Sequence, residues 1–207
     1  MVELFTSEGC SFCPPADKWA SSLKAGDAVT QTFQVGHWDH IGWANQFAAP
    51  AYTQRQRDST ARNNLRSIHT PQVVLDGKDW PRWGNLPESE ESARITITLR
   101  QLGANQFEAS VTPLSPSTSW SAYWTVTEHG HNSRVLSGEK KGEFSKHDFV
   151  VCQLVQAGQY KAGDPAAQKL TLRSIATTPG LPRQVNLVAR DGKPCETLQA
   201  ASLQFAG

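Results

Sequence analysis

The chain has 207 residues, with 20 Lys and Arg against 19 Asp and Glu, and 38% of its residues are hydrophobic. This length suffices for one large domain or two small ones with a buried core. The charges nearly cancel and form no run of five or more of one sign, which argues against a nucleic-acid partner or an anionic membrane surface. No apolar run reaches the ~18 residues of a membrane helix, so we expect no membrane span.

The first 93 residues alternate between strand-like and helix-like segments. Alternation of this kind is typical of an α/β unit, so we expect an α/β domain over residues 1–93. The arginines around its second helix are expected to form a solvated face: Arg55, Arg57, Arg62 and Arg66. The predicted segments, strands and helices in turn, are Val2–Thr6, Cys13–Lys24, Val29–Val35, Ala51–Leu65, Gln72–Leu75 and Glu88–Ala93.

From Arg94 onward the hydrophobic pattern has a period of two residues. Ile95, Ile97 and Leu99 alternate with polar residues, and similar runs follow to the end of the chain, separated by turn signals. Each run has one apolar face, as a half-buried strand does. The second domain, over residues 94–207, is therefore expected to be all-β and antiparallel, in the manner of a sandwich.

A C-x-x-C motif follows the first predicted strand and directly precedes the first predicted helix, with Cys10 and Cys13 as its cysteines. The amide groups at a helix start stabilise a thiolate, which is the nucleophilic form of cysteine. We therefore predict Cys10 as the attacking thiol and Cys13 as the resolving thiol of a redox pair. Because proline disfavours the helical conformation in the residue before it, Pro14 predicts a slightly altered helix start.

Two other interpretations of the cysteine pair stay open: an inert structural disulfide and a metal site. A zinc site would need two more ligands, and His37 with His40 have two intervening residues where three to five are usual. The redox interpretation is therefore favoured, and no metal and no cofactor is predicted.

The strand over Val29–Val35 ends in a segment that carries His37, Trp38 and Asp39. If this strand runs parallel to the first one, its carboxyl end lies beside Cys10, at the edge where open α/β sheets place their sites. His37 and Asp39 are accessory candidates for proton transfer, and ordinary loop residues with satisfied hydrogen bonds are the alternative.

Five short motifs lie within the first 74 residues: E-L-F-T-S at 3–7, G-C at 9–10, C-P-P-A-D at 13–17, W-D at 38–39 with Trp43, and T-P-Q-V-V at 70–74. In these motifs the sequence resembles a bacterial family of secreted, thioredoxin-like proteins of unknown function. The resemblance implies a thioredoxin-like N-terminal domain and an extracytoplasmic location, periplasmic or secreted, with the signal peptide presumed removed before Met1. It also implies a cis peptide bond before Pro71, which would position the substrate chain. Thr70 and Trp38 are further candidates for substrate binding, and a core or loop anchor is the alternative for Trp38.

The second pair of cysteines, Cys152 and Cys195, lies in the strand-rich half of the chain. We predict a structural disulfide between them, closing a loop of about 44 residues and stabilising the fold by roughly 4 kcal/mol in the chain-entropy model. Two buried thiols are the alternative. A disulfide would agree with an oxidising compartment.

These observations predict an extracytoplasmic thiol-disulfide oxidoreductase whose partners are proteins or small molecules with thiols or disulfides. The alternative is a non-enzymatic extracytoplasmic binding module in which the cysteine pair is an inert structural disulfide. Neither interpretation predicts an oligomeric state.

Overall fold

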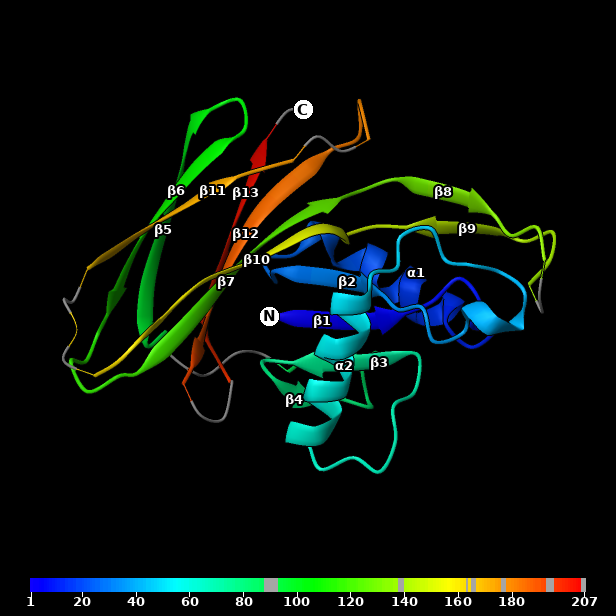
Figure 1. Ribbon diagram of the computed structural model, residues 1–207, viewed down its shortest axis with the longest axis horizontal. Coiled ribbons are helices and arrows are strands. Elements are labelled where there is room, and N and C mark those ends of the chain that lie inside the picture. Colours follow the sequence, from blue (N-terminus) through cyan, green and yellow to red (C-terminus); the bar gives the residue numbers. More distant parts are fainter. Residues whose placement is uncertain are drawn as a thin grey trace. The chain divides into compact units, whose positions relative to one another are not determined.

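The computed structural model (Figure 1) describes residues 1–87, 93–137, 140–162, 164, 167–175, 178–192 and 196–205. The chain forms two compact units: an N-terminal unit of residues 2–86 and 128–151, and a C-terminal unit of residues 1, 87–127 and 152–207. This division differs from the predicted consecutive domains 1–93 and 94–207, because the segment 128–151 returns to the N-terminal unit.

The N-terminal unit confirms most of the predicted local elements of this region. The predicted segments Val2–Thr6 and Gln72–Leu75 match their strands at both ends, and the other described segments differ by a few residues. The predicted helix Glu88–Ala93 lies almost wholly outside the described residues. The elements are β1 (Val2–Thr6), α1 (Pro14–Ser22), η1 (Leu23–Ala25), β2 (Thr30–Gln34), η2 (Asp39–Ile41), α2 (Pro50–Arg62), β3 (Gln72–Leu75), β4 (Lys78–Asp79), β8 (His131–Arg134) and β9 (Phe144–His147).

Strand β1 is central in this unit, parallel to β2 on one side and antiparallel to β3 on the other. All five of its residues are buried. Ala16 and Ala20 of α1 pack into the core with Val2, Leu4 and Val73. Because β2 is parallel to β1, the carboxyl ends of both strands lie at one edge, as predicted.

Helix α2 has a polar buried face that includes Arg55, whereas Arg57, Arg62 and Arg66 are exposed, as predicted. Its buried residues recur at helical spacing: Tyr52, Arg55, Gln56, Ser59 and Thr60. Arg55 donates from Nε to Glu3 Oε1 at 2.7 Å, and both side chains are buried. The spacing of the arginines could not predict that Arg55 is buried, because its partner Glu3 lies far away in the sequence.

The C-terminal unit consists of strands around an apolar core, as the two-residue period predicts. β5, β6 and β11 form one antiparallel sheet, and β12 pairs antiparallel with β13. Its largest fully buried side chains include Trp124 and Phe107. The strands are β5 (Ile95–Gly103), β6 (Gln106–Pro113), β7 (Trp120–Glu128), β10 (Val150–Tyr160), β11 (Gln168–Arg173), β12 (Arg183–Asp191) and β13 (Thr197–Phe205).

The prediction of an α/β thioredoxin-like N-terminal domain is wrong. In the described residues, thirteen strands accompany only two α-helices. β2 pairs in parallel with β10 at Val150 and Thr32, and eight strands form one mixed sheet in the order β13-β12-β7-β10-β2-β1-β3-β4. The chain is therefore mostly β. Sequence periodicity shows which segments are strands, but not which strand edges pair.

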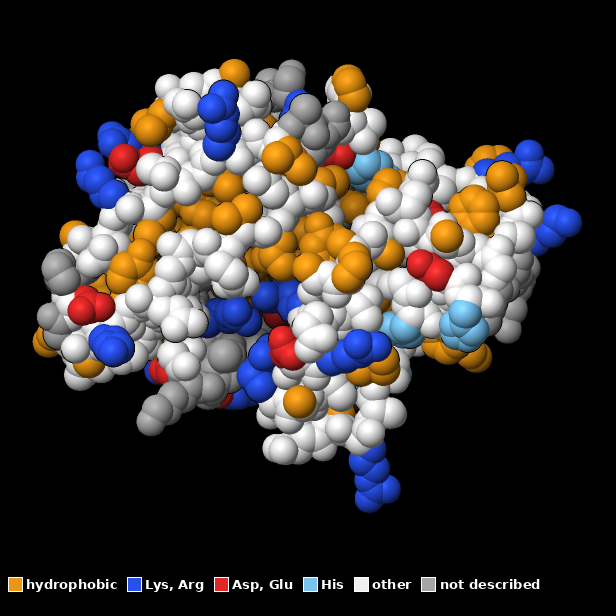
Figure 2. All heavy atoms as spheres, in the orientation of Figure 1, with side chains coloured by type: hydrophobic (Ala, Val, Ile, Leu, Met, Phe, Trp, Pro, Cys, Tyr) orange, Lys and Arg blue, Asp and Glu red, His pale blue; other side chains and the backbone are white. Residues whose placement is uncertain are grey.

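Two surface properties bear on the predicted partners. No helix within the described ranges is long and apolar enough to cross a membrane. On the face that Figure 2 shows, acidic side chains lie among the basic ones.

Candidate functional site

The loop between β1 and α1 holds the two cysteines one turn apart. The amide of Cys10 donates to Ser7 O at 3.1 Å, and the amide of Cys13 donates to Cys10 O at 3.3 Å. Cys13 is the N-cap of α1 and has the helical conformation, with φ −78° and ψ −32°. The altered helix start predicted from Pro14 is therefore not observed. The amides of Ala16 and Asp17 both donate to Cys13 O at 3.0 Å and continue the turn.

The two thiols differ in exposure. Cys13 is 0% exposed and Cys10 is 4% exposed, and Phe12 between them is 80% exposed. No disulfide joins Cys10 and Cys13 in this structure. Both cysteines are therefore buried, and Cys13 is buried completely.

Three segments meet at Cys10, as expected for Trp38 from the parallel strand order and for Thr70 from the family resemblance. The thiol of Cys10 lies 3.6 Å from Thr70 O, and Trp38 Nε1 donates to Thr70 Oγ1 at 2.7 Å. The peptide bond between Thr70 and Pro71 is cis, which confirms the expected geometry. A Cβ atom on Gly9 would lie 3.0 Å from Trp38 Cβ, so a glycine permits this close approach.

The surroundings of the two thiols also shift their pKa values in opposite directions. A hydrogen bond from Cys13 is the largest influence on Cys10, and together with those from Thr70 and the backbone it lowers the pKa of Cys10 to about 6, against the effect of burial. Burial and the neighbouring Cys10 raise the pKa of Cys13. Of the two thiols, Cys10 is therefore the one that ionises more readily near neutral pH, and the thiolate is the reactive form of cysteine.

This difference predicts a pH dependence of alkylation. We expect the rate of Cys10 modification by iodoacetamide to rise with a midpoint near pH 6, about two to three units below that of an ordinary thiol. Cys13 should stay unmodified over that range. Mass spectrometry of peptides from the reduced protein measures both rates, and a Cys10 midpoint above pH 8 would contradict the prediction.

The accessory candidates His37 and Asp39 occupy the loop beyond β2. Asp39 Oδ1 accepts the amide of Asn45 at 3.1 Å, so this carboxylate organises the loop. The ring of His37 packs against Trp38, with ring centres 5.6 Å apart. Burial and Arg57 lower the pKa of His37, against the effect of Asp39. Their predicted role in proton transfer stays a prediction.

A buried polar cluster behind the cysteines was not predicted. We call it the Glu8 cluster. Glu8 is 0% exposed, Trp43 Nε1 donates to its Oε2 at 2.8 Å, and Ser133 donates to its Oε1. His147 Nε2 lies 3.4 Å from Glu8 Oε1, and His147 Nδ1 lies 3.8 Å from Asp17 Oδ2. Burial raises the pKa of Glu8, but its hydrogen bonds with His147, Ser133 and Trp43 bring it below the ordinary value.

The only sequence signal for this cluster was the spacing of Asp17, four residues after Cys13 on the same helix. His147 and Ser133 come from β9 and β8, the strands of the returning segment, and β9 contacts α1 (Figure 1). No local pattern connects those strands to the C-x-x-C motif.

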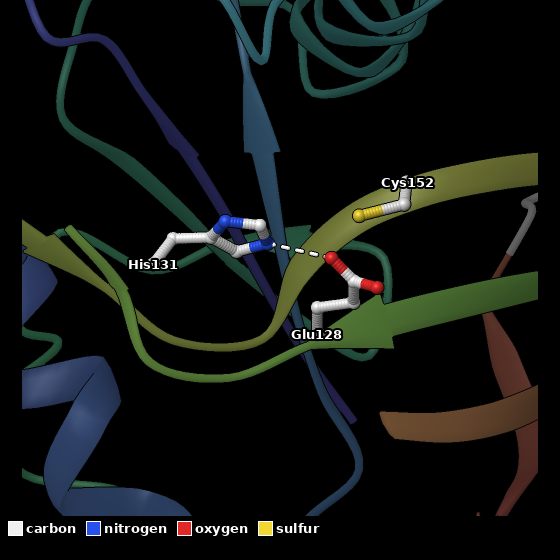
Figure 3. Close-up of side chains that lie close together, drawn as sticks. All are labelled: Glu128, His131 and Cys152. Carbon is white, nitrogen blue, oxygen red and sulfur yellow. Dashed lines mark ion pairs between the residues drawn. The ribbon is translucent and has the colours of Figure 1, made fainter. Parts of the chain in front are cut away.

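The returning segment also contains an ion pair at its start. His131 Nε2 lies 2.8 Å from Glu128 Oε2, and the two residues His129 and Gly130 link β7 to β8 between them (Figure 3). Cys195 lies outside the described residues, so its predicted disulfide with Cys152 stays a prediction.

A family model and a solved structure match most of the chain. The family model described as "Protein of unknown function (DUF1223)" matches residues 1–188. A crystal structure of a protein from Agrobacterium tumefaciens has a TM-score of 0.78 and 18% identity, over 100% of this chain and 93% of that one. At this identity the likeness concerns the fold alone.

Other solved structures match only in part. Beta-glucuronidase 2 of Bacteroides uniformis, bound to cyclophellitol-6-carboxylate aziridine, has 18% identity and a TM-score of 0.28, over 54% of this chain and 13% of that one. A Bacteroides uniformis beta-glucuronidase has the same identity and coverage and a TM-score of 0.27. These scores carry no argument about this chain. No curated protein matches it.

Proposed function

This chain belongs to the DUF1223 family, whose function is unknown, and we propose that it is an extracytoplasmic thiol-disulfide oxidoreductase. The observation that carries the proposal is the asymmetry of the cysteine pair. Cys10 has a pKa lowered to about 6 and lies next to the exposed Phe12, whereas Cys13 is fully buried and its pKa is raised. A nucleophilic thiolate with a shielded thiol one turn away is the arrangement that sequential disulfide exchange needs.

The proposed reaction has two exchange steps. The Cys10 thiolate attacks one sulfur of a substrate disulfide, forming a mixed disulfide and releasing the other substrate sulfur as a thiolate. Cys13 then loses its proton and attacks Cys10 Sγ, forming the Cys10–Cys13 disulfide and releasing the second substrate thiolate. The dithiol loses two electrons and the substrate disulfide gains them. An external thiol of low potential returns the protein to its reduced form.

The substrate side of the proposal rests on the residues around Cys10. The backbone of Thr70 lies beside the Cys10 sulfur, and Trp38 holds the Thr70 side chain. Phe12 is 80% exposed next to the nucleophile and would contact an apolar part of the substrate. We assign Thr70, Pro71, Trp38 and Phe12 to substrate binding, with proteins or small molecules that carry disulfides as substrates.

A redox titration of the Cys10–Cys13 pair tests this function. The full-length protein is equilibrated in defined thiol buffers, and alkylation followed by mass measurement gives the reduced fraction. We expect a midpoint within the roughly −270 to −120 mV range of known thiol-disulfide enzymes. A midpoint below about −300 mV would contradict an exchange function. Zinc measured in the same sample would favour the metal site instead.

A non-enzymatic binding module with an inert disulfide is the second candidate. The observation that favours it is the small exposed fraction of Cys10, 4%. Such a module needs no reversible reduction, so the titration separates the two candidates.

A further inference from the structure

The hairpin of β8 and β9 has a polar inner face. The two strands are antiparallel, and their buried side chains form two pairs across the strands: His131 with His147 and Ser133 with Ser145. Ser133 donates to Glu8 Oε1, and His147 Nε2 lies 3.4 Å from the same oxygen. The Glu8 cluster therefore explains why polar residues occupy the buried face.

The outer face of this hairpin carries apolar side chains. Phe144 lies opposite Arg134 and is 76% exposed, and the Arg134 guanidinium lies 5.6 Å from the centre of the Phe144 ring. Leu136, two residues beyond Arg134, is 62% exposed. A strand with one solvated face normally turns its apolar residues inward and its polar residues outward. The hairpin has the reverse arrangement, which is typical of an interaction surface.

Positive charge surrounds these apolar side chains. Arg134, Lys141 and Lys146 are exposed, and within the described residues 131–137 and 140–147 the one exposed carboxylate is that of Glu143. Figure 2 shows basic and hydrophobic side chains together at the end of the hairpin, whose strands Figure 1 labels. A basic surface attracts carboxylates and repels cations. Arginine beside an aromatic ring is also a combination that dominates the binding energy of many protein interfaces.

The charges distinguish three kinds of partner. A second copy of this chain would bring the same surface across a two-fold axis, so that cations would face cations. An anionic lipid layer would meet the exposed carboxylate of Glu143 as well as the cations. A polypeptide segment can place its carboxylates on the cations and away from Glu143, so the surface favours an acidic segment.

We propose that the outer face of the β8–β9 hairpin is a docking surface for an acidic segment of a partner polypeptide. An apolar side chain of this segment packs on Phe144 and Leu136, and its carboxylates accept hydrogen bonds from Arg134 and Lys146. The inner face holds the surface in place through the Glu8 cluster. The proposal does not depend on the redox function, because docking involves no thiol.

A phage-displayed library of random peptides tests the proposal. The library is panned on the immobilised full-length protein, and fluorescence anisotropy of the enriched peptides gives their Kd. We expect acidic sequences with an aromatic or aliphatic residue, whose binding weakens as salt is added. Phe144→Ser and Arg134→Glu should each raise the Kd at least about 10-fold.

The control variants make the same chemical changes elsewhere on the surface. Leu102→Ser removes an exposed apolar side chain of β5, and Arg66→Glu reverses an exposed positive charge beyond α2. Both should bind the enriched peptides as the wild-type protein does. Because Phe144 and Arg134 are exposed, their variants should unfold at the wild-type temperature, which thermal unfolding checks.

The other outcomes overturn the proposal. Enrichment of neutral or basic peptides, no enrichment, or equal binding by the wild-type, Phe144→Ser and Arg134→Glu proteins would show that the hairpin does not bind acidic segments. Sedimentation of the wild-type protein with phosphatidylglycerol vesicles, lost in Phe144→Ser, would assign the surface to a membrane. A dimer in analytical ultracentrifugation, lost in the same variant, would assign it to a second copy of this chain.

Discussion

Replacing Cys10 with Ser is expected to lower catalysed disulfide reduction by at least about 10³-fold, because no other thiol of the site is a thiolate at neutral pH. Cys13→Ser is expected to stop the reaction at a different point. Its Cys10 still attacks, and the mixed disulfide accumulates because no second sulfur displaces the substrate. Turnover of a protein disulfide with glutathione measures the first effect, and the mass of the trapped adduct measures the second.

The matched control for these variants is the double variant Cys152→Ser with Cys195→Ser, which removes both sulfurs outside the site and should keep the wild-type turnover of the folded protein. If the Cys10→Ser protein kept the turnover of the wild-type protein, Cys10 would not be the nucleophile. An adduct on Cys10→Ser but not on Cys13→Ser would contradict the order of the two thiols.

Arg55→Ala is expected to lower the free energy of unfolding by about 3–5 kcal/mol, because it leaves the Glu3 carboxylate buried without its cation. Arg55 donates to Glu3 Oε1 at 2.7 Å, and its guanidinium also lies 5.0 Å from the centre of the Phe33 ring. Urea unfolding of the wild-type and variant proteins measures the loss.

Two comparisons sharpen this prediction. Arg57 is exposed on the same helix, and Arg57→Ala should change the unfolding free energy by no more than about 0.5 kcal/mol. The double variant Glu3→Met with Arg55→Met should lose much less than Arg55→Ala, because no unpaired charge stays buried. A loss below about 1 kcal/mol for Arg55→Ala would show that the pair is not shielded from water.

Local signals predicted much of the secondary structure and part of the candidate site. The apolar run Val2–Thr6 and the segment Gln72–Leu75 are strands, and the alternation at Ile95 and Phe107 marks two strands of the C-terminal unit. The place of Trp38 near Cys10 followed from the parallel pairing of β1 and β2, and that of Thr70 followed from the family resemblance. The strand predictions depend only on neighbouring residues, and the approach of Trp38 to Cys10 depends on one pair of strands.

The failed predictions concern partners that are distant in sequence. The fold class was wrong because β2 pairs with β10 as well as with β1. Arg55 was expected in solvent because its partner Glu3 lies on another element. The Glu8 cluster escaped prediction because His147 and Ser133 arrive on a segment that sequence periodicity assigned to the other half of the chain.

The sequence by itself determined the local chemistry of this protein: two thiols separated by one helical turn, a proline before β3, and the strand segments with their apolar faces. These properties follow from backbone preference and hydrophobic period, which act over a few residues. Only the tertiary structure decided which strand edges pair and which buried charges face one another. Those choices minimise the free energy of the whole chain, since a buried carboxylate such as Glu8 is tolerable only where distant side chains supply its hydrogen bonds.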